Sequence, residues 1–326
     1  MELNNDVYGR CEIIDDILVT LLTCEAVQRL KQVQQAGANH LINPIRNVTR
    51  YEHSEGVMLL IRRIGGSLEE QIAGLLHDIS HTAFSHTIDV LVNSKDEDYH
   101  EIIKQEIVEH FDLCSYFSDS EYDISKILND KNYPILEQPQ PNLCADRIDY
   151  TIRDMKKLGV ITQPDINGFL DALAVVDGKI VVTNIQWAEW FCIQFHNLVK
   201  DVFMDPTENY YSKKFTNILN YALEIKCISM NDLIFGTDGK VLSMLHTHND
   251  SKLYELLAAF ENKLPVIIDR DNYELVIKPK ARVVDPLIFI DGIIGKLSDY
   301  SPVVSELSAK IKEIANDGLY LRVDTI

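Results

Sequence analysis

Apolar residues recur at helical spacing along most of the chain. One stripe, from Val57 to Ile64, predicts an amphipathic helix that ends at Gly65 and has His53 in its first turn. An earlier helix, beginning near Val27, is predicted to use Gly37 as its C-cap. The same spacing predicts further helices near residues 72–79, 86–91, 102–111, 142–158, 187–203, 209–223, 253–260 and 304–315.

The periodicity changes between Ala174 and Thr183, where two β-rich runs flank the turn-forming dipeptide Asp177-Gly178. Strand-like runs return in the last third, at 266–269, 273–278 and 319–323. The pattern therefore predicts a mainly α fold with a β-hairpin near 174–183. We expect a helical domain over residues 1–225 and a small α+β portion over 226–326 packed on it, or one continuous domain.

Composition narrows the class of protein. The 326 residues are 46% hydrophobic and 25% charged, which is ordinary for a globular protein with a sizeable core. A formal net charge of -19 argues against stable binding to nucleic acid or an anionic membrane. Six scattered cysteines without a CxxC pair, and no signal or membrane-spanning run, predict a cytoplasmic protein with reduced thiols.

A short stretch concentrates groups that can bind a metal. Between Gly74 and His86 the chain carries His77, Asp78 and His81 as well as His86 itself. Burying unpaired imidazole and carboxylate groups costs several kcal/mol, so a bound cation is the simplest explanation for such a core segment. We expect a helix to carry His77 and Asp78 on faces about 100° apart, with one ion between the two side chains.

The candidate ligands are His53, His77, Asp78 and Asp146, which the predicted helices would bring together. Two imidazoles and two carboxylates leave room in an octahedral shell for water and a substrate oxygen around one divalent ion (Mn, Fe, Mg, Zn, Co or Ni). Two alternatives remain open. The residues are satisfied polar groups of a helical core, or His77 and His81 form a zincin pair, although zincins require Glu where this chain has Asp78.

Three motifs occur in an order that resembles a known family. They are Thr49-Arg50-Tyr51-Glu52-His53, then His77-Asp78 followed by His81 and Phe84-Ser85-His86, then Asp146-Arg147-Ile148-Asp149-Tyr150 with Arg153-Asp154. Together they resemble the HD-domain phosphohydrolase superfamily, and most of all its deoxynucleoside triphosphate triphosphohydrolase branch. The resemblance extends over nearly the whole chain and is densest from Arg50 to Asp154.

The resemblance implies a metal held by the four candidate ligands, and it implies phosphoester or phosphoanhydride hydrolysis at a metal-polarised phosphorus. In the triphosphohydrolases the products are a nucleoside and tripolyphosphate. His86, Asp89 and His100 match the family's catalytic positions. His86 can donate a proton to a leaving oxygen if Asp89 orients it, while Asp89 and His100 could equally be ordinary polar surface residues.

Other residues are expected to contact the substrate. Arg50 and Arg147 are suited to phosphate, unless they form ordinary ion pairs. His81 should line the pocket without binding the metal. Tyr150 and Asp154 share a helix face with Asp146, and the resemblance implies that they contact the sugar.

One position departs from the resembled branch. Phe195 stands where that branch usually has an Arg for the phosphate tail, and the possible substitutes are His196, Lys200, Lys213 and Lys214. The sequence predicts a metal-dependent nucleotide phosphohydrolase, first of all a dNTP triphosphohydrolase, acting as a homodimer or homotetramer. The alternatives are a nucleotide monophosphatase or phosphodiesterase, and a nucleotide-binding sensor without catalysis.

Overall fold

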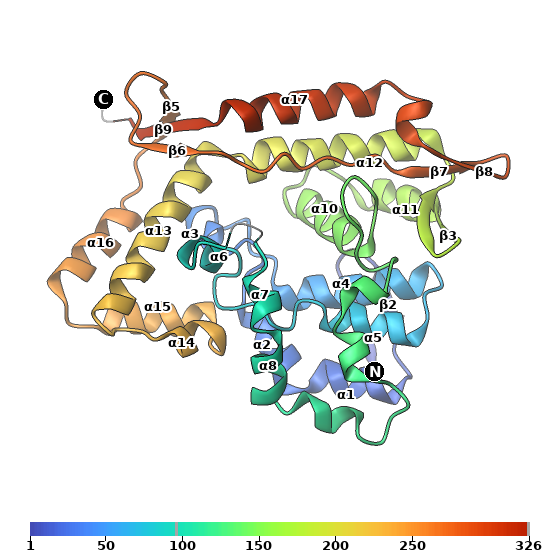
Figure 1. Ribbon diagram of the computed structural model, residues 1–326, viewed down its shortest axis with the longest axis horizontal. Helices are drawn as coiled ribbons and strands as arrows, with labels where there is room; N and C mark the ends of the chain where they lie inside the picture. Colours follow the sequence, from blue (N-terminus) through green and yellow to red (C-terminus); the bar gives the residue numbers. More distant parts are fainter. Residues whose placement is uncertain (95–96, 325–326) are drawn as a thin grey trace.

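The computed structural model describes residues 1–94 and 97–324, and most of them are helical (Figure 1). The first helices are α1 (Asp16–Thr23), α2 (Glu25–Arg29), α3 (Asn39–Ile42), α4 (Arg50–Arg63), α5 (Leu68–Leu76), α6 (Thr87–Leu91), α7 (Tyr99–Ile102), α8 (Lys104–His110), α9 (Ile124–Ile127), α10 (Ala145–Lys157), α11 (Gln163–Asp171), α12 (Ile185–Leu198) and α13 (Pro206–Glu224). The later helices are α14 (Met230–Ile234), α15 (Asp238–Thr247), α16 (Ser251–Glu261) and α17 (Val303–Asp317).

Small sheets accompany the helices. A hairpin opens the chain, and the other strands form a four-stranded sheet in the order β3-β4-β7-β8 and a three-stranded sheet in the order β5-β9-β6. The strands are β1 (Glu2–Asn5), β2 (Gly9–Glu12), β3 (Leu173–Val176), β4 (Lys179–Val182), β5 (Val266–Ile268), β6 (Leu275–Ile277), β7 (Leu287–Ile290), β8 (Ile293–Lys296) and β9 (Leu319–Val323). The mainly α prediction with small β portions is confirmed.

Helix α4 begins where its sequence places a capping box. The Thr49 hydroxyl accepts a hydrogen bond from the Glu52 backbone N–H at 3.1 Å, and the Glu52 carboxylate accepts one from the Thr49 N–H at 2.7 Å. Ser67 and Glu70 form the same pair at the start of α5. These caps fix where both helices begin, and therefore place His53 in the first turn of α4.

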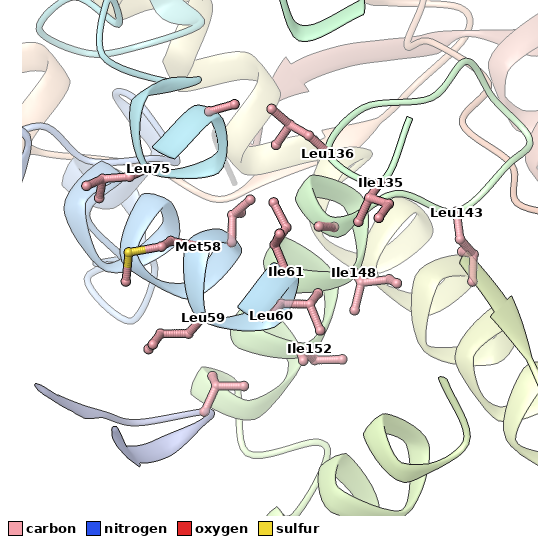
Figure 2. Close-up of a cluster of buried hydrophobic side chains, with 14 of the residues drawn as sticks. Met58, Leu59, Leu60, Ile61, Leu75, Ile135, Leu136, Leu143, Ile148 and Ile152 are labelled. Atoms are coloured by element: carbon pink, nitrogen blue, oxygen red, sulfur yellow. The ribbon is translucent and has the colours of Figure 1, made fainter. Parts of the chain in front are cut away.

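Apolar side chains join α4, α5 and α10 (Figure 2). Leu60 and Ile61 of α4, Leu75 of α5 and Ile148 of α10 are all fully buried. Gly74 lets α4 and α5 approach closely, because a Cβ at that position would lie 2.7 Å from Cδ1 of Ile61. This packing sets the mutual positions of the three segments that carry the candidate ligands.

The predicted hairpin at 174–183 is present as β3 and β4, and Asp177 and Gly178 both adopt positive φ as a tight primed turn requires. Strand β4 also pairs in parallel with β7, more than a hundred residues later, through Val182 and Ile288. The late part of the chain thus returns to the earlier helices, and α17 runs along α12 in Figure 1.

Two predicted helix ends were wrong. The helix near Val27 ends at Arg29 and continues as a 3-10 turn to Gln32, so Gly37 is not its C-cap. Gly37 instead permits a close approach, since a Cβ there would lie 2.7 Å from the Thr87 hydroxyl oxygen. Helix α5 ends at Leu76, and just beyond it the ring Nδ1 of His77 bonds the Gly74 carbonyl at 2.8 Å. His77 and Asp78 therefore lie in the turn that follows α5.

Several elements had no clear periodicity in the sequence. The strands β1, β2, β7 and β8 and the helices α1, α3, α9, α11, α14 and α15 were not predicted. Among residues 1–94 and 97–324, no helix combines the length and the apolar character needed to cross a membrane.

We predict that Ile148→Ala lowers the free energy of unfolding by about 2–4 kcal/mol, because it removes a fully buried side chain between α4 and α10. Chemical denaturation monitored by circular dichroism measures the change. Ile14→Ala is the matched control, since that side chain is 71% exposed. Equal losses in the two variants would contradict the assigned core.

Candidate metal centre

Three candidate ligand atoms converge between α4, the turn after α5, and α10. The Nε2 atoms of His53 and His77 lie 3.3 Å apart. Oδ1 of Asp146 lies 2.9 Å from Nε2 of His53 and 3.6 Å from Nε2 of His77. His53 is completely buried and His77 almost completely. Segments far apart in the sequence thus bring two imidazoles and a carboxylate to one point.

Asp78 lies at the edge of this cluster. Its two oxygens are 3.5 Å from Nε2 of His77 and 3.8 Å from Nε2 of His53. Arg50 also contacts it, with Nη1 2.6 Å from Oδ2, and His81 Nε2 lies 3.3 Å from Oδ1. Although burial disfavours the charged form, Arg50 and the histidines hold the pKa of Asp78 well below its usual range.

The hydrogen bonds at the far side of each ring decide what the cluster can bind. Nδ1 of His53 bonds Oδ2 of Asp149 at 2.8 Å, and Nδ1 of His77 bonds the Gly74 carbonyl at 2.8 Å. Both partners are acceptors, so both Nδ1 atoms carry a proton, and whenever the rings are neutral their Nε2 lone pairs face each other. Two facing lone pairs and a carboxylate oxygen need a cation between them, and this donor set fits a divalent metal.

The pKa shifts at the cluster also indicate that it attracts positive charge. Burial opposes protonation of His77, but the carboxylates of Asp78 and Asp146 outweigh it and raise its pKa to about 10. Burial likewise opposes ionisation of Asp146, yet His53 and His77 hold its pKa well below the ordinary value. The site attracts positive charge, whether it comes as protons or as a metal ion.

Asp149 supports His53 from behind. Its carboxylate is completely buried and accepts Nε and Nη2 of Arg153 at 2.9 and 2.8 Å as well as the His53 ring. The hydroxyl of Tyr8 also donates to it, at 2.8 Å. Sequence analysis did not select Asp149 as a site residue, although its place three residues after Asp146 in α10 was an available signal.

A second group of possible ligands adjoins Asp146 but suits a metal poorly. It consists of Glu137 and Cys144 together with Asp146 itself. Burial raises the pKa of the Cys144 thiol far above its usual value, so that sulfur keeps its proton. Burial and the Asp146 charge also raise the pKa of Glu137 to about 7.

The remaining histidines form a separate group beside the cluster. The rings of His81 and His100 stack with centroids 4.1 Å apart, and the His86 ring meets His81 edge-on at 5.0 Å. His86 is about half exposed, and its Nδ1 lies 2.9 Å from Oδ2 of the buried Asp89. Burial, Arg50 and His100 hold the pKa of His81 well below its usual value, so His81 stays neutral.

The loop that carries His81 and His86 contains strained backbone. Phe84 and Ser85 adopt φ angles of 61° and 44°, which non-glycine residues rarely do. The buried Asp238 accepts the N–H of Phe84 at 2.8 Å and that of Gln34 at 3.0 Å. Burial raises the pKa of Asp238 to about 7, against the opposing effect of these N–H groups and of Arg29.

Arg29 holds the same loop from another side. Its guanidinium donates to the carbonyls of Ile79 and His81 at 3.1 and 2.7 Å and to that of Gly236 at 3.0 Å. Arg29 and Asp238 were not among the predicted site residues. Their partners are distant in the sequence, and neither belongs to a local motif that reveals the contact.

The residues of α10 that were predicted to bind substrate differ in their surroundings. Tyr150 and Asp154 lie on the α10 face that also carries Asp146, and Arg46 approaches Asp154 at 3.7 Å. Arg147 is buried and donates instead to the carbonyls of Gln138 and Asn142.

The position that departs from the resembled branch lies in the core. Phe195 is buried in α12, with its ring 6.4 Å from that of Tyr150. Lys200, one of its possible substitutes, is exposed and pairs with the neighbouring Asp201.

Comparison with known proteins identifies the family. Residues 50–154 match the model of the HD domain, and the Bacillus subtilis protein YdhJ is 40% identical over 99% of both chains. The chain belongs to the HD-domain phosphohydrolases. It is therefore a metal-dependent hydrolase, and the metal that such a domain binds is a divalent ion.

More distant relatives agree with this assignment. The metal-dependent phosphohydrolase cns2 of Cordyceps militaris is 28% identical over 89% of this chain and 85% of its own length. The deoxynucleoside triphosphate triphosphohydrolase SAMHD1 homolog of Dictyostelium discoideum is 25% identical, over 99% of this chain and 60% of its own. A solved phosphohydrolase from Bacteroides thetaiotaomicron shares the fold with a TM-score of 0.71, at 18% identity over 98% of both chains.

We predict that Asp238→Ala lowers the free energy of unfolding of this HD phosphohydrolase by about 2–4 kcal/mol, because two backbone N–H groups lose their acceptor. Denaturant titration measures the loss. Asp123→Ala is the control, since Asp123 also accepts a backbone N–H but does so at the surface. A loss no larger than that of the control would contradict the role assigned to Asp238.

Proposed function

We propose that this HD phosphohydrolase acts on nucleotides and that its preferred substrate is a deoxynucleoside triphosphate, which it converts to a deoxynucleoside and tripolyphosphate. The observation that carries the proposal is that the His86–Asp89 pair connects to the metal ligands through His81: the His86 ring meets that of His81 at 5.0 Å, and Nε2 of His81 lies 3.3 Å from Asp78 at the edge of the cluster. A group able to transfer a proton thus adjoins a group of metal ligands, as phosphoryl hydrolysis requires.

In this proposal His53, His77 and Asp146 hold the divalent ion, and Asp78 completes the set from the edge. When bound, such an ion neutralises charge on phosphoryl oxygens and lowers the pKa of a coordinated water. Arg50 stays with Asp78 and adds positive charge beside the phosphate.

His86 protonates the leaving oxygen. Its Nδ1 is engaged with Asp89, so the other ring nitrogen, Nε2, is the one that transfers the proton. Asp89 is itself fixed by the backbone N–H of Tyr99 at 3.0 Å. The rings of His81 and His100 lie beside that of His86, with centroids 5.0 and 6.0 Å away.

The nucleotide part of the proposal rests on α10 and on the relatives. Tyr150 offers an aromatic face and Asp154 an acceptor for a sugar hydroxyl, both on the Asp146 side of the helix. Because Phe195 is apolar and buried, the phosphate tail needs another cation. Arg282 is the cation that we propose: it lies 5.6 Å from the Phe203 ring, which neighbours Tyr150, and it would exchange its present partner Glu97, 2.6 Å from its Nη2, for the phosphate.

The buried Phe195 also favours a second candidate on the same centre, a nucleotide monophosphatase or phosphodiesterase, whose substrate has no long tail. Product analysis with dGTP and dAMP separates the two, in the presence of Mn²⁺, Mg²⁺, Co²⁺ or Ni²⁺. We expect tripolyphosphate and deoxyguanosine from dGTP. Release of inorganic phosphate from dAMP, with dGTP left intact, would contradict the triphosphohydrolase and favour the monophosphatase or phosphodiesterase.

We predict that protein stripped with a chelator binds one Mn²⁺ per chain and that His77→Ala loses this binding, because Nε2 of His77 is one of the convergent atoms. Isothermal titration calorimetry measures stoichiometry and Kd. His248→Ala, at an exposed histidine outside the cluster, should bind as the wild type does. Undiminished binding by His77→Ala would rule out this cluster as the metal site.

We predict that His86→Gln lowers kcat by 10²- to 10⁴-fold, the usual contribution of a general acid, and leaves the Kd for Mn²⁺ unchanged. Steady-state kinetics on the dNTP substrate and a parallel metal titration measure the two quantities. His246→Gln is the control, as His246 is also half exposed and faces a carboxylate, Glu261 at 3.6 Å. Full activity of His86→Gln would contradict the proton transfer, and nucleotide binding without turnover in the wild type would favour the sensor alternative.

A further inference from the structure

The N-terminal hairpin reaches the back of the metal cluster. We propose that Tyr8, in the turn between β1 and β2, is a positioning residue for the metal: its hydroxyl fixes the Asp149 carboxylate, and Asp149 in turn orients the His53 ring. The inference rests on the metal site proposed above. It extends that site to a residue that is 141 positions from Asp149 in the chain and outside the HD motifs.

The two oxygens of Asp149 divide their partners. Oδ2 accepts Nδ1 of His53 and Nε of Arg153, while Oδ1 accepts Nη2 of Arg153 and the hydroxyl of Tyr8. Each oxygen therefore has two donors, and the carboxylate is held against rotation from both sides. The fixed carboxylate in turn fixes the orientation of the His53 ring, because Nδ1 of that ring bonds Oδ2.

The turn that carries Tyr8 is itself anchored. Asn5 is buried, and its side-chain oxygen accepts the backbone N–H groups of Val7 and Tyr8 at 3.0 and 3.2 Å. The Asn5 amide donates to Glu55 of α4 at 2.9 Å, and Gln163 of α11 donates to the Val7 carbonyl at 2.9 Å. The hydroxyl of Tyr8 therefore meets Asp149 at a defined place.

Burial and a neighbouring negative charge keep the Tyr8 hydroxyl protonated, so that it can donate. Burial and the neighbouring Asp149 charge raise the pKa of Tyr8 well above its ordinary value, so the phenol retains its proton near neutral pH. Without this donor, Oδ1 of the completely buried Asp149 would keep only Nη2 of Arg153 as a protein partner. The carboxylate would then shift toward its remaining partners, and His53 would follow it.

The test uses the full chain, stripped of metal by a chelator and titrated with Mn²⁺ by calorimetry. We expect Tyr8→Phe to raise the Kd for Mn²⁺ about tenfold, at the lower end of the effect of removing a partner that supports a metal ligand. Tyr221→Phe is the matched control, because Tyr221 also donates to a carboxylate, Asp250 at 3.2 Å, outside the cluster. A Kd for Tyr8→Phe within twofold of the wild type, or an equal loss in Tyr221→Phe, would overturn the proposal.

A double-mutant cycle separates positioning from general destabilisation. If Tyr8 acts through Asp149, adding Tyr8→Phe to Asp149→Asn raises the Kd no further, whereas additive losses would mean that Tyr8 acts by another route and would overturn the proposal. The wild-type titration also tests the metal site separately from the role of Tyr8. A wild type that binds no Mn²⁺ would refute the metal site, while normal wild-type binding with an unchanged Tyr8→Phe would refute only the role of Tyr8.

Discussion

The site depends on two imidazole nitrogens that face each other in the protein interior. The Nε2 atoms of His53 and His77 lie 3.3 Å apart with an oxygen of Asp146 beside them. Each ring already donates its Nδ1 proton to an acceptor, so neither has a second proton to offer without becoming charged. A divalent cation resolves this arrangement, and without one the cluster must take up protons instead.

The fold keeps these atoms in place by two different means. Helices α4 and α10 present His53 and Asp146 from a tightly packed apolar core, which gives the ligands little freedom. The loop bearing His81 and His86 packs Phe84 into a second apolar cluster, yet it adopts unfavourable backbone angles at Phe84 and Ser85. Hydrogen bonds from Arg29 and to Asp238 hold that loop in its strained conformation.

The sequence predicted what local patterns encode. The hairpin around Asp177-Gly178 and the mainly α fold follow from spacing and turn chemistry, and the structure contains both. The four candidate ligands stood in recognisable motifs, and the structure brings them within a few ångströms of one another. These features depend on residues close together in the chain or on known motifs.

Contacts between segments far apart in the sequence could not be predicted from local patterns or motifs. Asp238 lies 154 and 204 positions from the two backbone groups that it binds, and no periodicity or motif records the contact. The end of α5 was also missed, because the apolar spacing continues through Ile79 although the helix ends at Leu76. Arg147 was expected to contact substrate as a cation beside Asp146, and no local pattern indicated that its guanidinium also donates to loop carbonyls.

The most direct test of the account is an anomalous-difference map from crystals grown or soaked with Mn²⁺. The account predicts one strong peak among Nε2 of His53, Nε2 of His77 and Oδ1 of Asp146, with an oxygen of Asp78 at the edge of its coordination shell. No peak at this point, or a peak elsewhere on the chain with this cluster empty, would contradict it.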